Sequence, residues 1–382
     1  MQSRWLRALA LALLIPVSGA TKQHVHVVPL TPQEQKVKQI LLSLVTKEDK
    51  AIVTGHLNAL HTLFPLHSDA LRRALKRAQY LKFWAESRGL NVSGVDVGLR
   101  TPAIRFLTPR RVQIFGVVSE NYHLSRADAL DQSPVYDRFG LGIRHDYELV
   151  EKDRHWLISA DEFTDPLNQD TRLAHEAVPA SGFLRSSVPL SPSPGAEKAV
   201  EYANTYCGAA PGCGNGQHYN VHYTSYNGEG GDCTNFVSQA LLAGGFRMTP
   251  CWEYSRKQGE GSPAWVNADH LKHYLQASSR ATLYAYGSYA QLTKPTATYP
   301  GGAVNTLRPG DLISYIERGR AVHSALVVGY DRFGYPVVDS HTSDRFRVPW
   351  DLGWDRHTMY NLWHVHYPKP VPNSLGPRTR HF

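Results

Sequence analysis

One cysteine in this sequence lies where a thiol gains reactivity. Cys233 follows Asp232 and opens a stretch in which apolar residues recur at helical spacing, at positions 236, 237, 240, 241 and 244. Asp232 is a favourable N-cap, and Gly244 and Gly245 are favourable residues for ending a helix. A thiol in the first helical turn lies at the positive end of the helix dipole, which favours the thiolate. The sequence therefore predicts an activated cysteine nucleophile.

A cysteine nucleophile needs a base and a group that orients the base. His323 is the best candidate for the base, because it opens a run of small and β-branched residues at 323–330 that predicts a strand. A second strand is predicted at 336–341, and it carries Asp339 and His341. Either of these two side chains is a candidate for the third member of the site.

The loop between the two predicted strands decides which face these side chains share. If 332–334 form a three-residue loop with Gly334 in the left-handed conformation, Asp331 faces Tyr335 and His323 faces Ser343. Asp339 and His341 then lie on the same side of the sheet as His323, since side chains alternate along a strand. A loop of two or four residues would put them on the other face.

Each of these residues also has an ordinary structural explanation. A cysteine is often a small buried apolar residue, and a histidine at a strand end is often a satisfied edge residue. Asp339 is explained equally well as a polar residue that caps or turns the end of the strand. The order of a cysteine that opens a helix, a histidine that opens a strand and a polar strand end is harder to obtain by chance than any one of them.

The cysteine block also resembles a known family. The sequence Asp-Cys-Thr-Asn-Phe-Val-Ser-Gln-Ala-Leu-x-Ala-Gly-Gly, at 232–245, is similar to the signature of the "putative amidase domain" family, relatives of the NlpC/P60 and CHAP cysteine hydrolases. The similarity extends over about 196–368 and includes Trp252, Pro309-Gly310-Asp311, His323-Ser324-Ala325 and His341-Thr342.

The resemblance implies a papain-like α+β core with Cys233 as nucleophile and His323 as base. The recurrent histidine of the family falls at His341, which is our preferred third member, although Asp339 is the stronger orienting acceptor on charge grounds. Cys233 would attack an amide carbonyl, and backbone N–H groups at the helix start would bind the oxyanion. Tyr223 or Tyr226 is a candidate for a further hydroxyl donor.

No cofactor or metal is expected for this chemistry. Aromatic residues downstream of the cysteine are candidates for lining a groove, although Trp265 is better explained as a core residue; they are Trp252, Tyr254 and Trp265. Cys207 and Cys213 flank a short Gly/Pro loop that a disulfide would close, and a zinc site is the alternative. Cys251 would then be a lone buried thiol.

The order of helical and extended patterns predicts an α+β protein of two domains. Residues 1–20 have the charged start, short apolar run and small-residue end of a signal peptide. A domain over 25–163 opens with a helix capped by Thr31, Pro32 and Glu34, has a second helix near 68–88, and continues as short strands at 92–100, 103–108, 112–118, 142–150 and 155–159. His145, Tyr147, Leu149, Trp156 and Ile158 give it a likeness to cystatin-like or NTF2-like curved-sheet domains.

A Pro/Ser-rich linker is predicted over 164–195, the amidase domain over 196–368 and a basic tail over 369–382. Within the amidase domain we expect helices near 196–207 and 265–276 in addition to the helix that Cys233 opens.

Composition narrows the class of protein. The chain has 382 residues, 42% of them hydrophobic and 19% charged, which is typical of a globular protein. The formal net charge is +8, and no basic stripe with interleaved aromatic residues indicates nucleic-acid binding. We therefore predict a secreted, monomeric amidase or peptidase, not inserted in a membrane, whose substrate is peptidoglycan peptide or a similar amide. The alternative is a catalytically idle binding module of the same fold.

Overall fold

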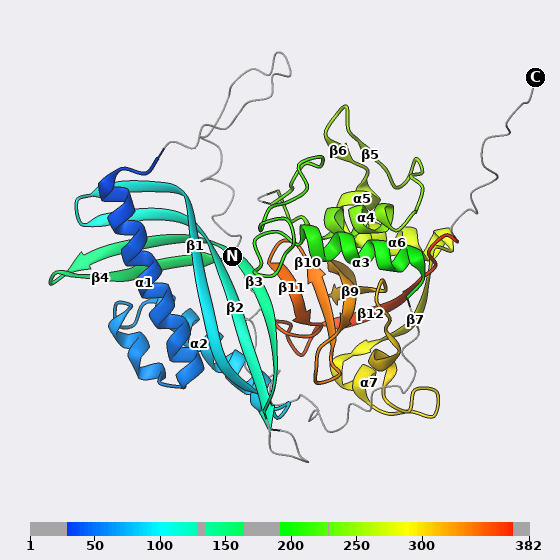
Figure 1. Ribbon diagram of the computed structural model, residues 1–382, viewed down its shortest axis with the longest axis horizontal. Helices are drawn as coiled ribbons and strands as arrows, with labels where there is room; N and C mark the ends of the chain where they lie inside the picture. Colours follow the sequence, from blue (N-terminus) through cyan, green and yellow to red (C-terminus); the bar gives the residue numbers. More distant parts are fainter. Residues whose placement is uncertain (1–28, 128–133, 164–191, 228, 370–382) are drawn as a thin grey trace, which may run out of the picture.

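The computed structural model describes residues 29–127, 134–163, 192–227 and 229–369, and it shows an α+β protein (Figure 1). The predicted signal peptide and nearly all of the predicted linker and basic tail lie outside these residues. The N-terminal half contains α1 (Pro32–Thr54), η2 (Leu57–Thr62), α2 (Asp69–Glu86), β1 (Asn91–Thr108), β2 (Arg111–Ala127), β3 (Pro134–Lys152) and β4 (His155–Phe163).

The first N-terminal helix begins where its capping residues predict, and the second begins within one residue of its predicted start. The Thr31 hydroxyl accepts a hydrogen bond from the backbone N–H of Glu34, and the Glu34 carboxylate accepts one from the backbone N–H of Thr31, so α1 opens with a capping box. The Ser68 hydroxyl caps α2 by accepting from the N–H of Leu71 at 3.1 Å. Both predicted helices are therefore confirmed.

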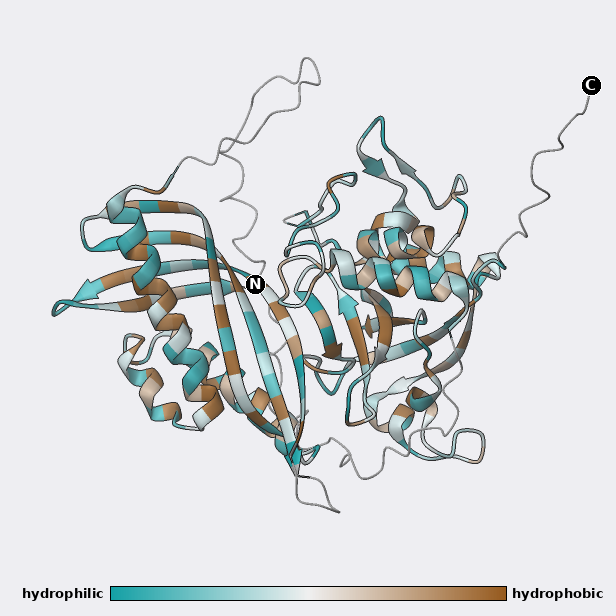
Figure 2. Cartoon of the chain, in the orientation of Figure 1, coloured by the Kyte–Doolittle hydropathy of each residue, from teal (hydrophilic) through white to brown (hydrophobic). Residues whose placement is uncertain are grey.

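The strands of this half are longer than the short runs predicted from the sequence. The runs at 92–100 and 103–108 belong to one strand, β1, because a register shift between Arg100 and Ala103 lets the strand continue past Pro102. β3 and β4 form the predicted hairpin, in which Asp153 and Arg154 both have positive φ at the two-residue turn. The apolar residues of α1 and α2 pack against this curved sheet (Figure 2).

The C-terminal half has helices on both sides of a second group of strands (Figure 1). Its helices and 3₁₀ turn are α3 (Pro194–Tyr206), α4 (Cys233–Ala243), α5 (Pro263–Val266), α6 (Ala268–Ser278), α7 (Tyr289–Thr293) and η5 (Ala303–Thr306). Its strands are β5 (Tyr254–Ser255), β6 (Glu260–Gly261), β7 (Ala281–Ser288), β8 (Leu312–Glu317), β9 (Arg320–Tyr330), β10 (Pro336–Ser340), β11 (Asp344–Pro349) and β12 (Met359–Val365).

The helix predicted near 265–276 is divided. Asn267 has extended backbone angles, φ −116° and ψ 128°, so α5 ends there. The side chain of Asn267 then caps α6 by accepting from the N–H groups of Asp269 and His270. A residue that caps one helix cannot also continue the previous helix, so the structure has two helices where the sequence predicts one.

The two groups of strands form one sheet. β11 pairs with β3, with Asp344 opposite Gly142, and the strand order is β1-β2-β3-β11-β10-β9-β8-β12-β7, with β4 paired to β3. Nothing in the local sequence of β3 signals this pairing between strands about 200 positions apart in the chain.

Residues in and just after helix α2 contact the C-terminal half and hold the two halves together. Arg88, just after α2, forms a fully buried ion pair with Asp351, and its guanidinium lies over the ring of Trp84. The hydroxyl of Tyr80 accepts a hydrogen bond from the N–H of Gly353 at 2.8 Å. The turn after β11 is therefore held by the N-terminal half.

Candidate active site

Cys233 is the first residue of α4, as predicted, but its thiol is not activated by its surroundings. The side chain is 8% exposed, and its sulfur lies 3.7 Å from the Thr234 hydroxyl and next to the backbone of Ser324 in β9. Burial raises the pKa of the Cys233 thiol, and hydrogen bonds from Ser324 and Thr234 oppose this only in part. Desolvation thus outweighs the helix-terminal effect that the sequence predicts.

The strand register shows why the predicted triad is not assembled. The loop has the predicted form: Gly334 has φ 85°, and the N–H of Asp331 donates to the carbonyl of Tyr335 at 2.8 Å. The first two strand pairs follow the predicted register, but a bulge follows, and Asp339 pairs with Leu326 instead of Val327. A slip of one residue moves a side chain to the other face of a sheet. The prediction that Asp339 and His341 share a face with His323 is therefore wrong.

His323 lies on the face of the sheet away from α4. Its ring packs against Tyr315 at 5.4 Å and Trp354 at 5.3 Å between ring centroids, in the apolar core that α7 also joins. Leu326 and Val328, on the opposite face of β9, pack in the core that contains the apolar residues of α4.

His323 is also held in its neutral form. Burial, with a smaller contribution from Arg345, lowers the pKa of His323 to about 3. Its Nε2 is buried and has no hydrogen-bond partner among the described residues. Within those residues no hydrogen bond joins it to Cys233.

His341 has a different partner from the one predicted. Its Nδ1 lies 2.6 Å from Oδ2 of Asp232, and its Nε2 lies 2.6 Å from the carbonyl oxygen of Tyr206. Both ring nitrogens are therefore within hydrogen-bond distance of other groups. The ring stacks on Phe236 at 4.2 Å, one turn along α4 from Cys233. Both ring nitrogens of His341 are thus engaged with Asp232 and Tyr206, and neither contacts His323.

Asp339, the other candidate for the third member, is also engaged elsewhere. Its Oδ1 accepts a hydrogen bond from the backbone N–H of Arg347 at 2.7 Å. Burial raises the pKa of Asp339 to about 7. Asp339 is completely buried, and its carboxyl group stabilises the end of β10 through this hydrogen bond.

Asp232 organises the start of α4, a role that sequence reasoning missed. Its side chain does not cap the helix; its Oδ1 accepts from the N–H of Tyr226 at 2.8 Å and from the Asn235 amide at 2.9 Å. The N–H of Asp232 donates to the Thr342 hydroxyl at 2.9 Å. With the bond to His341, this one buried carboxylate connects the Gly-rich loop, α4 and the end of β10. An acidic residue directly before the cysteine was the available signal, but it also fits an N-cap.

The aromatic residues near the cysteine mainly form a packed support. Trp265 is fully buried, and its Nε1 donates to Oδ1 of Asn235 at 2.8 Å. Trp252 is also buried, and it packs against Trp265 at 4.8 Å between ring centroids. Tyr223 lies between Tyr254 and Trp265. The core explanation predicted for Trp265 is confirmed.

The Gly-rich segment before α4 is closed by a disulfide between Cys207 and Cys213. The carbonyl of Ala209, inside this loop, accepts a hydrogen bond from the Ser119 hydroxyl of β2 at 2.8 Å. Cys251 is free and exposed, so the prediction of a lone buried thiol is wrong. The hydrogen bond between Ser119 and Ala209 places the disulfide-closed loop against the N-terminal half of the sheet.

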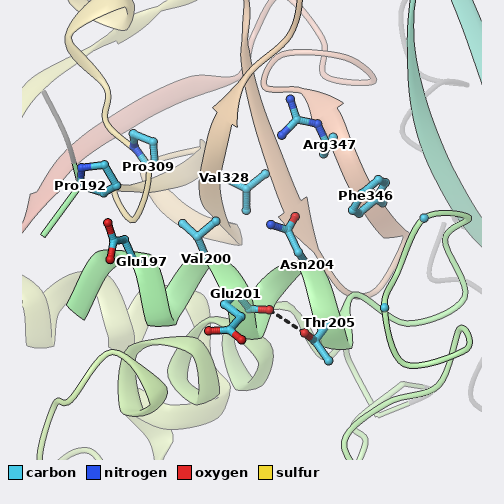
Figure 3. Close-up of a pocket in the computed structure, with 12 residues that line it drawn as sticks. Pro192, Glu197, Val200, Glu201, Asn204, Thr205, Pro309, Val328, Phe346 and Arg347 are labelled. Carbon is cyan, nitrogen blue, oxygen red and sulfur yellow. Dashed lines mark hydrogen bonds between the residues drawn. The ribbon is translucent and has the colours of Figure 1, made fainter. Parts of the chain in front are cut away.

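An open cavity of the C-terminal half does not contain the cysteine. It has a volume of about 710 Å³ and lies between α3, β9 and β11 (Figure 3). Glu197, Val200 and Asn204 of α3 face Val328 across it, while the side chains of Cys233, His323 and His341 do not line it. In the part of the chain that the structure describes, no group of three or more His, Cys, Asp or Glu side chains is arranged to hold a metal ion.

The chain has detectable relatives. It is 31% identical over 155 residues to the uncharacterized protein YhbB of Bacillus subtilis (strain 168), an alignment that covers 38% of this chain and 40% of the relative. The chain thus spans less than half the length of that relative. Within the described segments, no helix has the length and apolar character needed to cross a membrane.

Two solved structures show weak likeness. The intermembrane space region of the chloroplast protein ARC6 aligns over 33% of this chain and 95% of its own, with a TM-score of 0.23 and 16% identity. The Kfla4162 protein of Kribbella flavida aligns over 37% and 99%, with a TM-score of 0.25 and 15% identity. For the C-terminal half, residues 194–363 match the family model described as "Putative amidase domain".

Proposed function

We propose that residues 196–368 form a cysteine-dependent amide hydrolase with Cys233 as its nucleophile. The observation that carries this proposal is the position of Cys233 as the first residue of α4, inside the segment that matches the amidase family model. The first N–H groups of a helix have no partner within the helix, so they are available to bind an oxyanion. Cys233 would attack the amide carbonyl, the leaving amine would take a proton, and water would hydrolyse the thioester.

His323 remains the proposed base, and its use requires a local change in β9. The pairing of β8 with β9 leaves Val322 as an extra residue between His323 and Ala321, which are opposite Tyr315 and Ile316. If that extra residue followed His323 instead of preceding it, the imidazole would turn to the face of α4. Because the sulfur of Cys233 already lies next to Ser324, the imidazole would then be adjacent to the thiol.

The structure supports a positioning role for His341. We propose that His341 holds Asp232, and through it the first turn of α4, while Cys233 and His323 carry out the chemistry. The 2.6 Å contact between Nδ1 of His341 and Asp232 supports this role. A positioning residue of this kind affects the reaction through the geometry of the helix start.

For the substrate we propose peptide amide bonds of peptidoglycan. A signal-like N-terminus and a net charge of +8 suit a secreted protein that works near anionic polymers. In this proposal the papain-like catalytic domain at 196–368 follows an NTF2-like or cystatin-like domain at 25–163, with 164–195 as the connection. The protein would act as a monomer without a cofactor.

A catalytically idle binding module is the second candidate, and one observation favours it. Burial raises the pKa of the Cys233 thiol, and neither His323 nor His341 hydrogen-bonds to it among the described residues. A thiol of this kind reacts slowly with electrophiles at neutral pH.

Amide hydrolysis by matched variants distinguishes the two candidates. Purified cell wall is incubated with the wild type, Cys233→Ala and Cys251→Ala, and the released fragments are identified by mass. The hydrolase proposal expects release by the wild type and Cys251→Ala and none by Cys233→Ala. His323→Ala is expected to abolish release while the rate of alkylation of Cys233 falls at neutral pH. If no protein releases fragments and the alkylation rate does not depend on His323, the idle module is correct.

A further inference from the structure

A cavity at the far end of the N-terminal half gathers basic side chains from two separate elements. Its volume is about 650 Å³, and it lies between α1, η2 and the tip of the β3–β4 hairpin. Lys47 comes from α1, and Lys152, Arg154 and His155 come from the hairpin. Figure 1 shows that α1 and this hairpin lie away from the C-terminal half. We call these four residues the basic cluster.

The basic cluster is held in place by the fold. Lys152 pairs with His155 at the end of the hairpin, and Asp153 and Arg154 form its turn with φ values of 51° and 64°. The N–H of Ile158 in β4 donates to the carbonyl of Leu63 at 2.9 Å, which fixes the hairpin against the segment after η2. The hairpin therefore presents its cations beside Lys47 on a defined frame.

The basic cluster brings cations from two elements to the lining of one cavity. No ion pair is formed by the four side chains among the described residues, and Asp153 is the one acidic residue that lines the cavity. Some other cations of this half have carboxylate partners, as Arg72 has Asp69, Arg73 has Glu162, Lys82 has Glu86 and Arg111 has Glu148, whereas others, such as Lys36 and Lys76, form no ion pair among the described residues. Like charges placed together repel one another, so the cluster suits an anionic ligand that offsets the repulsion.

The lining of the cavity favours a polymer over a membrane surface. Leu44 and Leu63 are buried in its floor, and Trp156 is half-buried in its wall. Side chains that enter a bilayer must project from the surface, whereas these apolar groups line a concave site.

We propose that the basic cluster is a binding site for an anionic polymer that carries phosphate groups along its chain. The site lies in the N-terminal half and does not depend on the proposed chemistry of Cys233. Binding there would hold the protein on a polyanionic matrix and leave the C-terminal half free to act.

The test measures binding of the full chain to long-chain inorganic polyphosphate, in 50 mM and 200 mM NaCl buffers. The wild type is expected to bind at the lower salt concentration and to lose most of its affinity at the higher one, because such binding releases counterions. Lys152→Glu/Arg154→Glu is expected to weaken binding by about tenfold or more. Lys47→Gln, which leaves the hairpin unchanged, should weaken it by a smaller factor.

The matched control is Arg256→Glu/Lys257→Glu, which makes the same change of charge at an exposed position in the C-terminal half. It should bind within about twofold of the wild type, and so should Cys233→Ala, whatever the outcome of the hydrolysis experiment. Equal weakening by the two double variants would overturn the proposal, since only net charge would then matter. Binding to phosphatidylglycerol vesicles without binding to polyphosphate would also overturn it and assign the cluster to membranes.

Discussion

Nδ1 of His341 lies 2.6 Å from Oδ2 of Asp232, and both side chains are 2% exposed. Removing the Asp232 carboxylate leaves three buried groups without that hydrogen-bond partner, the N–H of Tyr226, the Asn235 amide and the His341 ring, and an unsatisfied buried group costs about 1–3 kcal/mol or more. Asp232→Ala should therefore lower the free energy of unfolding by about that amount, as measured by urea denaturation. Asp69→Ala, which removes an exposed pair with Arg72, is the control and should change stability by less than about 1 kcal/mol. Equal effects of the two substitutions would contradict the role given to Asp232.

The burial of His323 predicts a pH dependence of stability. Its pKa is lowered to about 3 in the folded protein from an ordinary value of 6.5, so the unfolded chain binds a proton more readily. Stability from this group is complete above pH 6.5 and is lost as the pH falls towards 3. Between pH 6.5 and pH 5 the wild type should lose about 2 kcal/mol more than His323→Gln.

Urea unfolding at the two pH values measures this difference. His357→Gln, at an exposed position, is the matched control and should behave like the wild type. If His323→Gln shows the same loss of stability as the wild type, His323 is not buried in neutral form on the face away from α4.

The ion pair between Arg88 and Asp351 predicts that the two halves of the chain stabilise each other. Both side chains are almost completely buried. Arg88→Met should cost about 3–5 kcal/mol, because it leaves the carboxylate of Asp351 buried without a partner. The double variant Arg88→Met/Asp351→Asn should recover part of that loss.

Chemical denaturation followed by tryptophan fluorescence reports this change. Lys82→Met on the same helix removes an exposed pair with Glu86 and is expected to have little effect. A loss of less than about 1 kcal/mol for Arg88→Met would show that this contact does not hold the halves together.

The disulfide between Cys207 and Cys213 closes a loop with a sequence separation of six. A loop of this length restricts the unfolded chain by about 2 kcal/mol in the chain-entropy description. Cys207→Ala/Cys213→Ala should lower stability by about that amount, whereas Cys251→Ala, which removes an exposed free thiol, should not. A double variant as stable as the wild type would contradict this expectation.

Local signals in the sequence were sufficient for the parts of the fold that depend on neighbours in the chain. Thr31 with Glu34 marks a helix start that the structure confirms, and Gly334 adopts the predicted left-handed conformation. The start of α4 at Cys233 was also predictable, because helical spacing is a local property, although the predicted capping by the Asp232 side chain is not present.

Features that depend on distant pairing were not predictable. The bulge that places Asp339 opposite Leu326 shifts the pairing of β10 with β9 by one residue, so Asp339 and the residues after it lie on the opposite face from the one predicted relative to His323. No residue type marks this bulge. The burial of Cys233 and His323 comes from β9 and its neighbours packing over long sequence separations. Helix position predicted a lowered thiol pKa, whereas the burial of the thiol raises it.

The most direct test of the proposed hydrolase is the trapping of an acyl group on Cys233. The Cys251→Ala protein, which retains a single free thiol, is mixed with a peptide amide from cell wall, quenched in acid and analysed by intact mass and by digestion. The proposal predicts an added acyl mass on the fragment that contains Cys233, its loss on treatment with hydroxylamine, and no adduct or amine release in Cys233→Ala/Cys251→Ala. Amide cleavage at an unchanged rate in that double variant would contradict the central claim.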